Sequence, residues 1–223
     1  MAVIGTMMPI HAVAALREQP PLAGSRQISG LGSLGTNYLG HFALTGLLLP
    51  FVRQQSGSCI VEVASLAHTR TTLHLDDLQL QRSYTAGTAY SQSKLAMLMF
   101  GLELDRRLKA VKSTIRSIPA HPGVAATDIT RAGGQAGPMR RWLAARLFRL
   151  VGQSPAHGAL PLLFAATNPD AIAGVYYGPG GWFEAEGSPA PAAIAPHAQD
   201  RQAAAQLWSM SEKVTGVNYH LTT

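Results

Sequence analysis

The sequence predicts an α/β fold with a parallel sheet, from two strand-like runs and the helical pattern between them. Residues 59–65 (CIVEVAS) and 114–118 (TIRSI) are rich in β-branched side chains, which is typical of mostly buried strands. Between them, residues 90–108 carry apolar side chains at helical spacing, at Leu95, Leu98, Met99 and Leu102. A strand, a helix and a second strand in this order are typical of α/β proteins. The length of 223 residues and the hydrophobic content of 47% suit one domain with a sizeable core.

The remaining elements are expected around this centre. Residues 36–50 form a largely apolar segment that predicts a helix before the first strand. Residues 156–166 and 200–215 predict two further helices. Residues 174–178 predict a last short strand, and the Pro/Gly/Ala-rich residues 180–196 a surface loop. Residues 1–34 do not continue this pattern. We therefore divide the chain into an atypical N-terminal segment, 1–34, and the remainder of a single domain, 35–223.

Tyr90 and Lys94 place a phenol and an ammonium four residues apart. On a helix, these two side chains lie on one face, one turn apart. A cation beside a phenol favours the phenolate and lowers its pKa from a reference of roughly 10. Such a tyrosine can exchange a proton with an alcohol or carbonyl oxygen while hydride moves. Two solvated side chains on a helix surface would give the same pattern, so the spacing alone leaves both interpretations open.

Further candidates stand where ligands bind or where turns form. Ser65 ends the first predicted strand, and open α/β sheets bind ligands beyond the carboxyl ends of their strands, so its hydroxyl can polarise a substrate carbonyl. Pro122-Gly123 follow the second strand, with Thr127 shortly after, and Asn37 opens the apolar helix. Each also has a simpler interpretation: a turn residue for Ser65, a strand end for Pro122-Gly123 and a helix cap for Asn37.

The order of these residues resembles that of the short-chain dehydrogenase/reductase family. That family has an asparagine, a serine at a strand end, Y-x-x-x-K and a P-G-x-x-x-T loop, and this order is met here by Asn37, Ser65, Tyr90, Lys94, Pro122, Gly123 and Thr127. The stretch between the serine and the tyrosine is long for the family. Within it, residues 75–78 (LDDL) are similar to an insertion in the branch of retinol dehydrogenases and light-dependent protochlorophyllide reductase. The resemblance covers residue 35 to nearly the C-terminus and implies a Rossmann-like, doubly wound parallel sheet.

The resemblance implies a catalytic role for four residues. Tyr90 would be the general acid/base, and Lys94 would lower its pKa. Ser65 would hold the substrate oxygen. Asn37 would fix a water that continues the proton path toward Lys94. Together these roles imply hydride transfer to or from a carbonyl or alcohol.

The resemblance also implies a nicotinamide cofactor, NAD or NADP, which brings the hydride. Tyr90 and Lys94 would bind its nicotinamide ribose. Pro122 and Gly123 would run beside the nicotinamide, and Thr127 would contact the carboxamide. The resemblance further implies a homodimer or homotetramer. The residues that select NAD or NADP belong to a part of the family pattern that this chain does not show.

The start of the chain departs from the family pattern. Members open with a strand, a G-x-x-x-G-x-G turn and a helix whose N-terminus receives the pyrophosphate. Only 36 residues precede Asn37, and they contain no such turn. Residues 30–35 (GLGSLG) satisfy G-x-G-x-x-G, but they follow a loop-like stretch, and no acid stands between Glu18 and Glu62. We therefore expect an N-terminally incomplete sheet with an exposed edge, and impaired dinucleotide binding.

Composition and charge argue against several other classes of protein. The single cysteine, Cys59, cannot form an internal disulfide, and the eight histidines show no metal-ligand spacing, so we expect a cytoplasmic protein without a metal site. The longest apolar run, residues 42–51, falls short of the roughly 20 residues that span a bilayer. The net charge of +6 is concentrated in the amphipathic residues 140–149. We interpret that segment as a substrate lid; a membrane-surface helix is the alternative, and no aromatic-basic pattern favours nucleic acid.

Three functions follow from these observations. The first is an NAD(P)-dependent oxidoreductase of the short-chain dehydrogenase type, acting on a carbonyl or alcohol of a small, fairly apolar substrate. The second is a truncated, non-catalytic remnant of that family, unable to bind the dinucleotide, since the phosphate-binding turn is missing. The third is a basic membrane-surface protein, which rests on residues 140–149 alone. The ordered set of Asn37, Ser65, Tyr90 and Lys94 favours the first.

Overall fold

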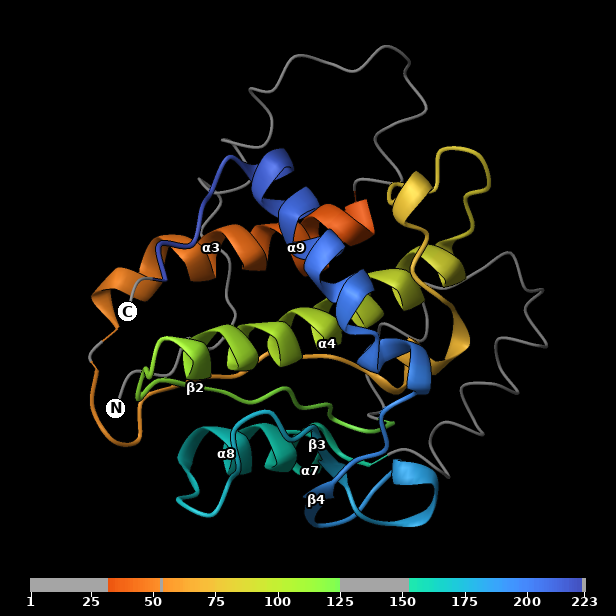
Figure 1. Cartoon of the computed structure of the whole chain (residues 1–223). Helices are drawn as coiled ribbons and strands as arrows, with labels where there is room; N and C mark the ends of the chain where they lie inside the picture. Colours follow the sequence, from red (N-terminus) through yellow and green to blue (C-terminus); the bar gives the residue numbers. More distant parts are fainter. Residues whose placement is uncertain (1–31, 53, 125–152, 222–223) are drawn as a thin grey trace, which may run out of the picture.

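The computed structural model of the chain describes residues 32–52, 54–124 and 153–221. It confirms an α/β fold with a small parallel sheet (Figure 1). In chain order the elements are η1 (Gly35–Leu39), α3 (Gly40–Leu48), η2 (Leu49–Phe51), β1 (Cys59–Ile60), η3 (Leu66–Arg70), η4 (Leu75–Asp77), α4 (Ala86–Ala110), β2 (Arg116–Ser117), α7 (Pro155–Gly158), α8 (Leu160–Thr167), β3 (Tyr177–Pro179), η5 (Trp182–Glu184), β4 (Pro189–Pro191), η6 (Pro196–Gln199) and α9 (Arg201–Thr215).

The sheet is built from three segments that run in the same direction. β1 pairs in parallel with β2, and the pairing continues beyond both strands at Val63 and Ala120. Ala120 also pairs in parallel with Tyr177, which brings β3 beside β2, while β4 joins β3 as an antiparallel edge. Because parallel strands end at the same edge of a sheet, the residues that follow β1 and β2 lie near each other.

Helices cover both faces of this sheet, with α3, α4 and α9 on one side and α7 and α8 on the other (Figure 1). The alternation of side chains along β1 explains the two layers. Ile60 belongs to the core formed with α3, α4 and α9, whereas Cys59 and Val61 belong to the core formed with α8. Burial on both faces accounts for the unbroken run of apolar, β-branched residues at this strand.

The long helix α4 begins before the predicted start at residue 90. Thr85 caps it, because its side chain accepts a hydrogen bond from the backbone N–H of Thr88, 3.1 Å away. The helix therefore already has a full turn before it reaches Tyr90. Its interior face is buried from Ala89 to Leu108, which anchors the helix against the sheet. A firmly held helix fixes the directions of the Tyr90 and Lys94 side chains.

Four expectations for the regular elements were wrong in detail. Asn37 is not a helix cap, because it lies inside the π-helical turn η1. The helix expected at 156–166 is divided into α7 and α8, since Pro161 has no N–H to donate to the carbonyl four residues before it. The last strand lies at Tyr177–Pro179 instead of 174–178, because Gly174 has a left-handed φ of +79°. The segment 180–196 is not only a loop, since it contains β4.

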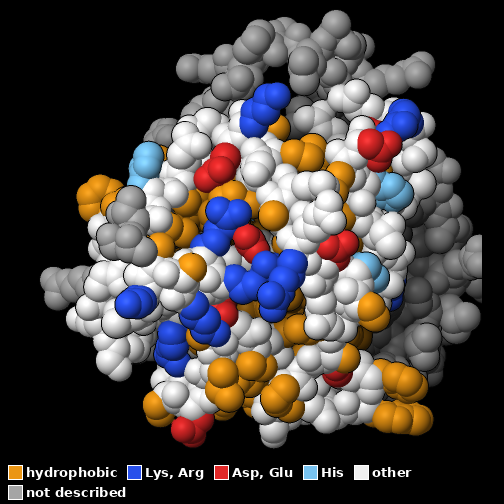
Figure 2. All heavy atoms as spheres, viewed as in Figure 1, with side chains coloured by type: hydrophobic (Ala, Val, Ile, Leu, Met, Phe, Trp, Pro, Cys, Tyr) orange, Lys and Arg blue, Asp and Glu red, His pale blue; other side chains and the backbone are white. Residues whose placement is uncertain are grey.

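Basic and acidic side chains mix on the face that carries α4 and α9 (Figure 2). On α4, Glu103 forms ion pairs of 2.6 Å with Arg106 and 2.7 Å with Arg107, and Asp105 forms one of 2.6 Å with Lys109. Such i,i+3 and i,i+4 pairs stabilise the exposed end of the helix modestly. Within the described ranges, no helix combines the length and apolarity needed to cross a membrane. The basic segment 140–149 lies outside those ranges.

Candidate active site

Tyr90 and Lys94 lie one turn apart on α4, as the spacing predicts. The ammonium nitrogen of Lys94 is 5.9 Å from the centroid of the Tyr90 ring. It donates a hydrogen bond of 2.9 Å to the backbone carbonyl of Val63, at the carboxyl end of the β1 segment. Burial lowers the pKa of Lys94 to about 8, so the side chain stays mostly protonated at pH 7. The lysine thus places its positive charge between the tyrosine and the end of the sheet.

Asn37 is connected to the same turn of α4 through Ser93. The Asn37 side-chain amide donates to the Ser93 hydroxyl over 3.0 Å, and that hydroxyl donates to the Tyr90 backbone carbonyl over 2.8 Å. Ser93 is fully buried. The chain of hydrogen bonds ties the π-helical turn η1 to the turn that carries Tyr90. The Y-x-x-x-K pattern specifies no residue at this position, so Ser93 was missed in the sequence.

Ser65 lies in extended backbone immediately before η3, which packs against α4. Its hydroxyl oxygen accepts a hydrogen bond of 3.2 Å from the Ala67 N–H, and its carbonyl accepts one of 2.8 Å from Nδ1 of His68. As the turn interpretation predicts, the Ser65 hydroxyl oxygen therefore accepts a hydrogen bond from the nearby backbone. The hydroxyl proton is not used in either bond, so Ser65 keeps a donor for a substrate oxygen.

The Pro122-Gly123 turn follows the β2 segment, as expected, and Gly123 has a left-handed φ of +67°. A glycine fits this conformation without strain. The Gln153 side chain donates a hydrogen bond of 2.7 Å to the Pro122 carbonyl, and the Val124 N–H donates one of 2.9 Å to the Ala185 carbonyl. These two hydrogen bonds hold the turn from two sides. Thr127 lies outside the described residues.

A buried aromatic layer connects the two ends of the site. The Tyr176 ring is 5.5 Å from the His68 ring and 4.9 Å from the His121 ring, measured between centroids. His68 supports Ser65, and His121 directly precedes the Pro122-Gly123 turn. Both histidines are fully buried, and burial lowers the pKa of each. Within the described part of the chain, no cluster of three or more histidine, cysteine, aspartate or glutamate side chains has a metal-binding arrangement.

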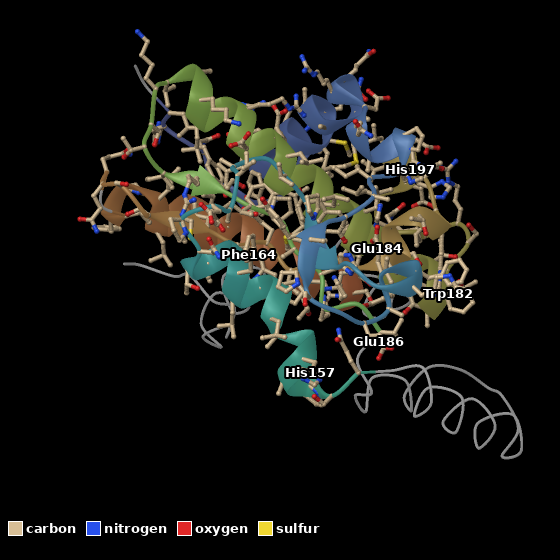
Figure 3. The ribbon with its side chains drawn as sticks, turned by 90° about the horizontal axis from the view of Figure 1, so that it is seen from below. His157, Phe164, Trp182, Glu184, Glu186 and His197 are labelled. Carbon is tan, nitrogen blue, oxygen red and sulfur yellow. The ribbon has the colours of Figure 1, made fainter. Side chains whose placement is uncertain are left out.

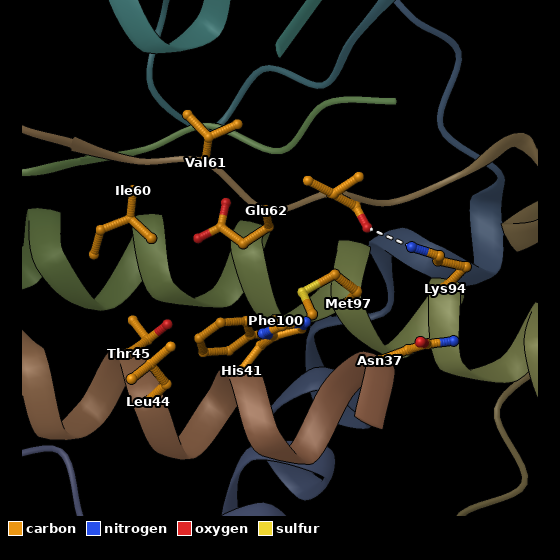
Figure 4. Close-up of a pocket in the computed structure, with 11 residues that line it drawn as sticks. Asn37, His41, Leu44, Thr45, Ile60, Val61, Glu62, Lys94, Met97 and Phe100 are labelled. Carbon is orange, nitrogen blue, oxygen red and sulfur yellow. Dashed lines mark hydrogen bonds between the residues drawn. The ribbon is translucent and has the colours of Figure 1, made fainter. Parts of the chain in front are cut away.

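A cavity of about 250 Å³ opens beside β1 (Figure 4). Asn37 and Lys94 line it together with His41 and Glu62, whereas Ser65 and Tyr90 do not. Its wall includes the edge of the β1 segment that faces away from β2, and within residues 32–52, 54–124 and 153–221 no strand pairs with that edge. Asn37 and Lys94 therefore line one cavity, whereas Ser65 and Tyr90 lie outside its lining.

The donors of this region fit the nicotinamide half of a dinucleotide. Lys94 uses only one of its three N–H groups, and the Tyr90 hydroxyl makes no hydrogen bond with the described residues. Together with the Ser65 hydroxyl, they match the hydroxyls of a ribose and the oxygen of a carbonyl. Gly32 and Gly35 are already helical, so the described part of G-x-G-x-x-G does not form a phosphate-binding loop after a strand.

Comparison with known proteins identifies relatives, although no family model matches the chain. Retinol dehydrogenase 13 of Homo sapiens is 37% identical over 185 residues, which are 82% of this chain and 53% of that protein. Polyprenol dehydrogenase of Mus musculus is 38% identical over 190 residues, with the same two coverages. The crystal structure of an uncharacterized protein from Mycobacterium paratuberculosis superposes with a TM-score of 0.65 at 35% identity, covering 84% of this chain and 60% of that one.

The chain spans about half the length of the curated relatives it matches. The retinol and polyprenol dehydrogenases are members of one family of oxidoreductases. The similarity agrees with the order of motifs and with the placement of Tyr90 and Lys94 on one helix after a parallel strand. The chain belongs to the short-chain dehydrogenase/reductase family, in the branch that contains the retinol dehydrogenases.

Proposed function

We propose that this protein is an NAD(P)-dependent oxidoreductase that moves hydride to or from a carbonyl or alcohol of a small, fairly apolar molecule. The observation that carries the proposal is the placement of Lys94 between Tyr90 on α4 and the Val63 carbonyl at the end of the β1 segment. Lys94 thus places a cation beside the Tyr90 ring, and Ser65 follows the same strand with a hydroxyl proton to donate.

In this proposal, the bound dinucleotide supplies the hydride, and the chain supplies position and proton transfer. Tyr90 gives its proton to the carbonyl oxygen during reduction and takes it back from the alcohol during oxidation. Lys94 holds the nicotinamide ribose. Ser65 donates to the substrate oxygen, and Asn37 holds the turn of Tyr90 through Ser93.

In this proposal, the Pro122-Gly123 turn contacts the cofactor. It follows β2 at the edge of the sheet where Ser65 follows β1, which is where open α/β sheets bind their ligands. We propose that the nicotinamide lies against this turn and that Thr127 contacts its carboxamide. Tyr90, Lys94 and the Pro122-Gly123 turn would contact only the part that NAD and NADP share.

An apolar substrate is supported by an aromatic pair near this turn. Trp182 and Phe183 are 85% and 80% exposed, with ring centroids 5.1 Å apart, in the loop that contacts Gly123. The relatives retinol dehydrogenase and polyprenol dehydrogenase are named for the alcohols retinol and polyprenol. We propose the same class of substrate here, an alcohol or aldehyde with an extended hydrocarbon part.

We further infer that the sheet is an incomplete Rossmann-like, doubly wound sheet. The edge of β1 at the cavity supports this, since no described strand covers it. The same observation favours a second candidate function, a remnant that no longer binds the dinucleotide. A parallel strand buried on both faces is normally paired on both edges, so an edge left unpaired by the whole chain would weaken the site that it supports.

Replacing Tyr90 by phenylalanine tests the proposed mechanism. Removal of the phenolic proton is expected to lower the rate of carbonyl reduction about 10²- to 10⁴-fold, while the Kd for NADPH or NADH changes little. Tyr84→Phe, a substitution at an exposed tyrosine outside the site, is the control and is expected to leave both unchanged. An undiminished rate in Tyr90→Phe would reject the mechanism. Absence of dinucleotide binding by the unaltered chain would favour the remnant.

A further inference from the structure

His121 has both ring nitrogens engaged in a fully buried position. The Gly123 N–H donates to its Nδ1 over 3.1 Å, so Nδ1 must carry the lone pair. Nε2 then carries the proton and donates to a carboxylate oxygen of Glu184, 3.2 Å away. Burial lowers the pKa of His121 to about 4, although Glu184 opposes the shift, so the ring is neutral at pH 7, as this tautomer requires. The ring therefore connects Glu184 to the Gly123 amide.

Glu184 is itself held in an unusual backbone conformation. Its second carboxylate oxygen accepts a hydrogen bond of 2.7 Å from the Ala193 N–H. Phe183 and Glu184 are both left-handed, with φ of 52° and 53°, a conformation that is strained for residues other than glycine. In Figure 3, Glu184 lies toward the body of the molecule, and Trp182 lies at its rim. The carboxylate thus lies between the His121 ring and the Ala193 N–H.

The fit between the loop and the turn leaves no spare room. A Cβ atom at Gly123 would lie 2.5 Å from the Ala185 carbonyl oxygen and 2.9 Å from that of Glu184. A Cβ atom at Gly178 would overlap Nε2 of His121. Glycines at both positions let the loop, the imidazole and the turn approach closely. Such an arrangement specifies one geometry for the turn.

We propose that His121 and Glu184 are positioning residues, which hold the Pro122-Gly123 turn in the left-handed geometry that receives the nicotinamide. The part of this statement that concerns the nicotinamide rests on the proposed function. Neither residue touches the reacting atoms. They act through the Gly123 amide, which they fix by the chain from the Glu184 carboxylate to Nε2 and from Nδ1 to the Gly123 N–H.

Two near-isosteric variants separate the halves of this connection. His121→Asn keeps a carbonyl oxygen close to the place of Nδ1 and can still accept from Gly123, but it does not reach Glu184. His121→Gln keeps an amide N–H close to the place of Nε2 and can still donate to Glu184, but it leaves the Gly123 N–H without an acceptor. The control is His157→Gln on α7, an exposed residue whose side chain makes no hydrogen bond within the described residues.

Two measurements are made on the full chain: the Kd for NADPH and NADH by fluorescence titration, and the hydrogen exchange of the Gly123 and Val124 amides by NMR. His121→Gln is expected to weaken dinucleotide binding about tenfold or more and to speed Gly123 exchange. His121→Asn, which loses only the link to Glu184, is expected to lie between the unaltered protein and His121→Gln in both measurements. Glu184→Gln, which can still accept from Nε2 through its amide oxygen, is expected to stay within about threefold of the unaltered protein.

The outcomes distinguish this inference from the proposed function. If His121→Asn and His121→Gln bind the dinucleotide equally and protect Gly123 equally, the positioning role is wrong. A shared loss of unfolding free energy without a difference in Gly123 protection would also overturn it. If the unaltered chain binds no dinucleotide, the proposed function fails, and Gly123 exchange alone then decides whether His121 holds the turn.

Discussion

Glu62 gives the stability of this protein an unusual dependence on pH. The side chain is buried in the wall of the cavity beside β1 (Figure 4). One carboxyl oxygen is 2.8 Å from the Ser117 hydroxyl, and the other has no hydrogen-bond partner within the described residues. The Ser117 hydroxyl is also 2.8 Å from the Gly101 carbonyl. A single hydroxyl proton cannot serve both acceptors, so a protonated Glu62 that donates to Ser117 satisfies all three groups.

The magnitude follows from the pKa. Burial raises the pKa of Glu62 from 4.5 to about 8, against the smaller lowering effect of Ser117. Below pH 4.5 the carboxyl is neutral in the folded and the unfolded chain, and folding carries no penalty. Between pH 4.5 and 8 only the unfolded chain ionises, so the free energy of unfolding falls by about 1.4 kcal/mol per pH unit. At pH 7 the accumulated loss of unfolding free energy is about 3 kcal/mol. The loss continues to grow up to pH 8 and is constant at higher pH.

Glu62→Gln removes this penalty while keeping the shape of the side chain. The glutamine amide can donate to Ser117, and Ser117 can then donate to the Gly101 carbonyl. We expect the variant to be more stable than the unaltered protein by up to about 3 kcal/mol at pH 7, with a gain that shrinks toward zero near pH 4.5. The assay is urea unfolding at closely spaced values between pH 4.5 and 8.5, for both proteins.

The matched control is Glu186→Gln, because Glu186 is exposed. Its difference from the unaltered protein is expected to be small at every pH. A gain for Glu62→Gln that does not change with pH would refute the titration argument. A variant that is less stable at pH 8 than the unaltered protein would show that the carboxylate is favourably ionised in the folded chain.

Two further predictions concern packing near the candidate site. Ser93→Ala removes the hydrogen-bonded bridge between Asn37 and the Tyr90 carbonyl. We expect it to lower the free energy of unfolding by about 1 to 3 kcal/mol, because buried polar groups lose their partner. A loss below about 0.5 kcal/mol in urea unfolding would contradict the role of the bridge. Gly123→Ala and Gly216→Ala both place alanine at a φ near +67°, but only the first brings the new Cβ against neighbouring atoms. We expect Gly216→Ala to cost about 1 kcal/mol and Gly123→Ala clearly more, and equal losses in thermal unfolding would show that the loop yields to the turn.

Local pattern was sufficient for the elements that depend on neighbours along the chain. The β-branched runs predicted the parallel segments around β1 and β2, and the i,i+4 spacing predicted that Tyr90 and Lys94 share a face of α4. Asp200 caps the terminal helix, as a residue of its type does before an apolar period. Boundaries were less accurate, because capping by Thr85 and the proline inside 156–166 act over single residues.

Contacts between distant residues required the tertiary structure. Asn37 and Ser93 are 56 positions apart, and His121 and Glu184 are 63 apart, so no periodicity relates them. The sequence by itself determined the α/β class, the order of the candidate catalytic residues and the side of α4 that carries two of them. Only the tertiary structure decided that Lys94 bonds to the Val63 carbonyl and that His121 accepts from Gly123. Sheet register and helix packing set these distances, and neither is encoded in a local pattern.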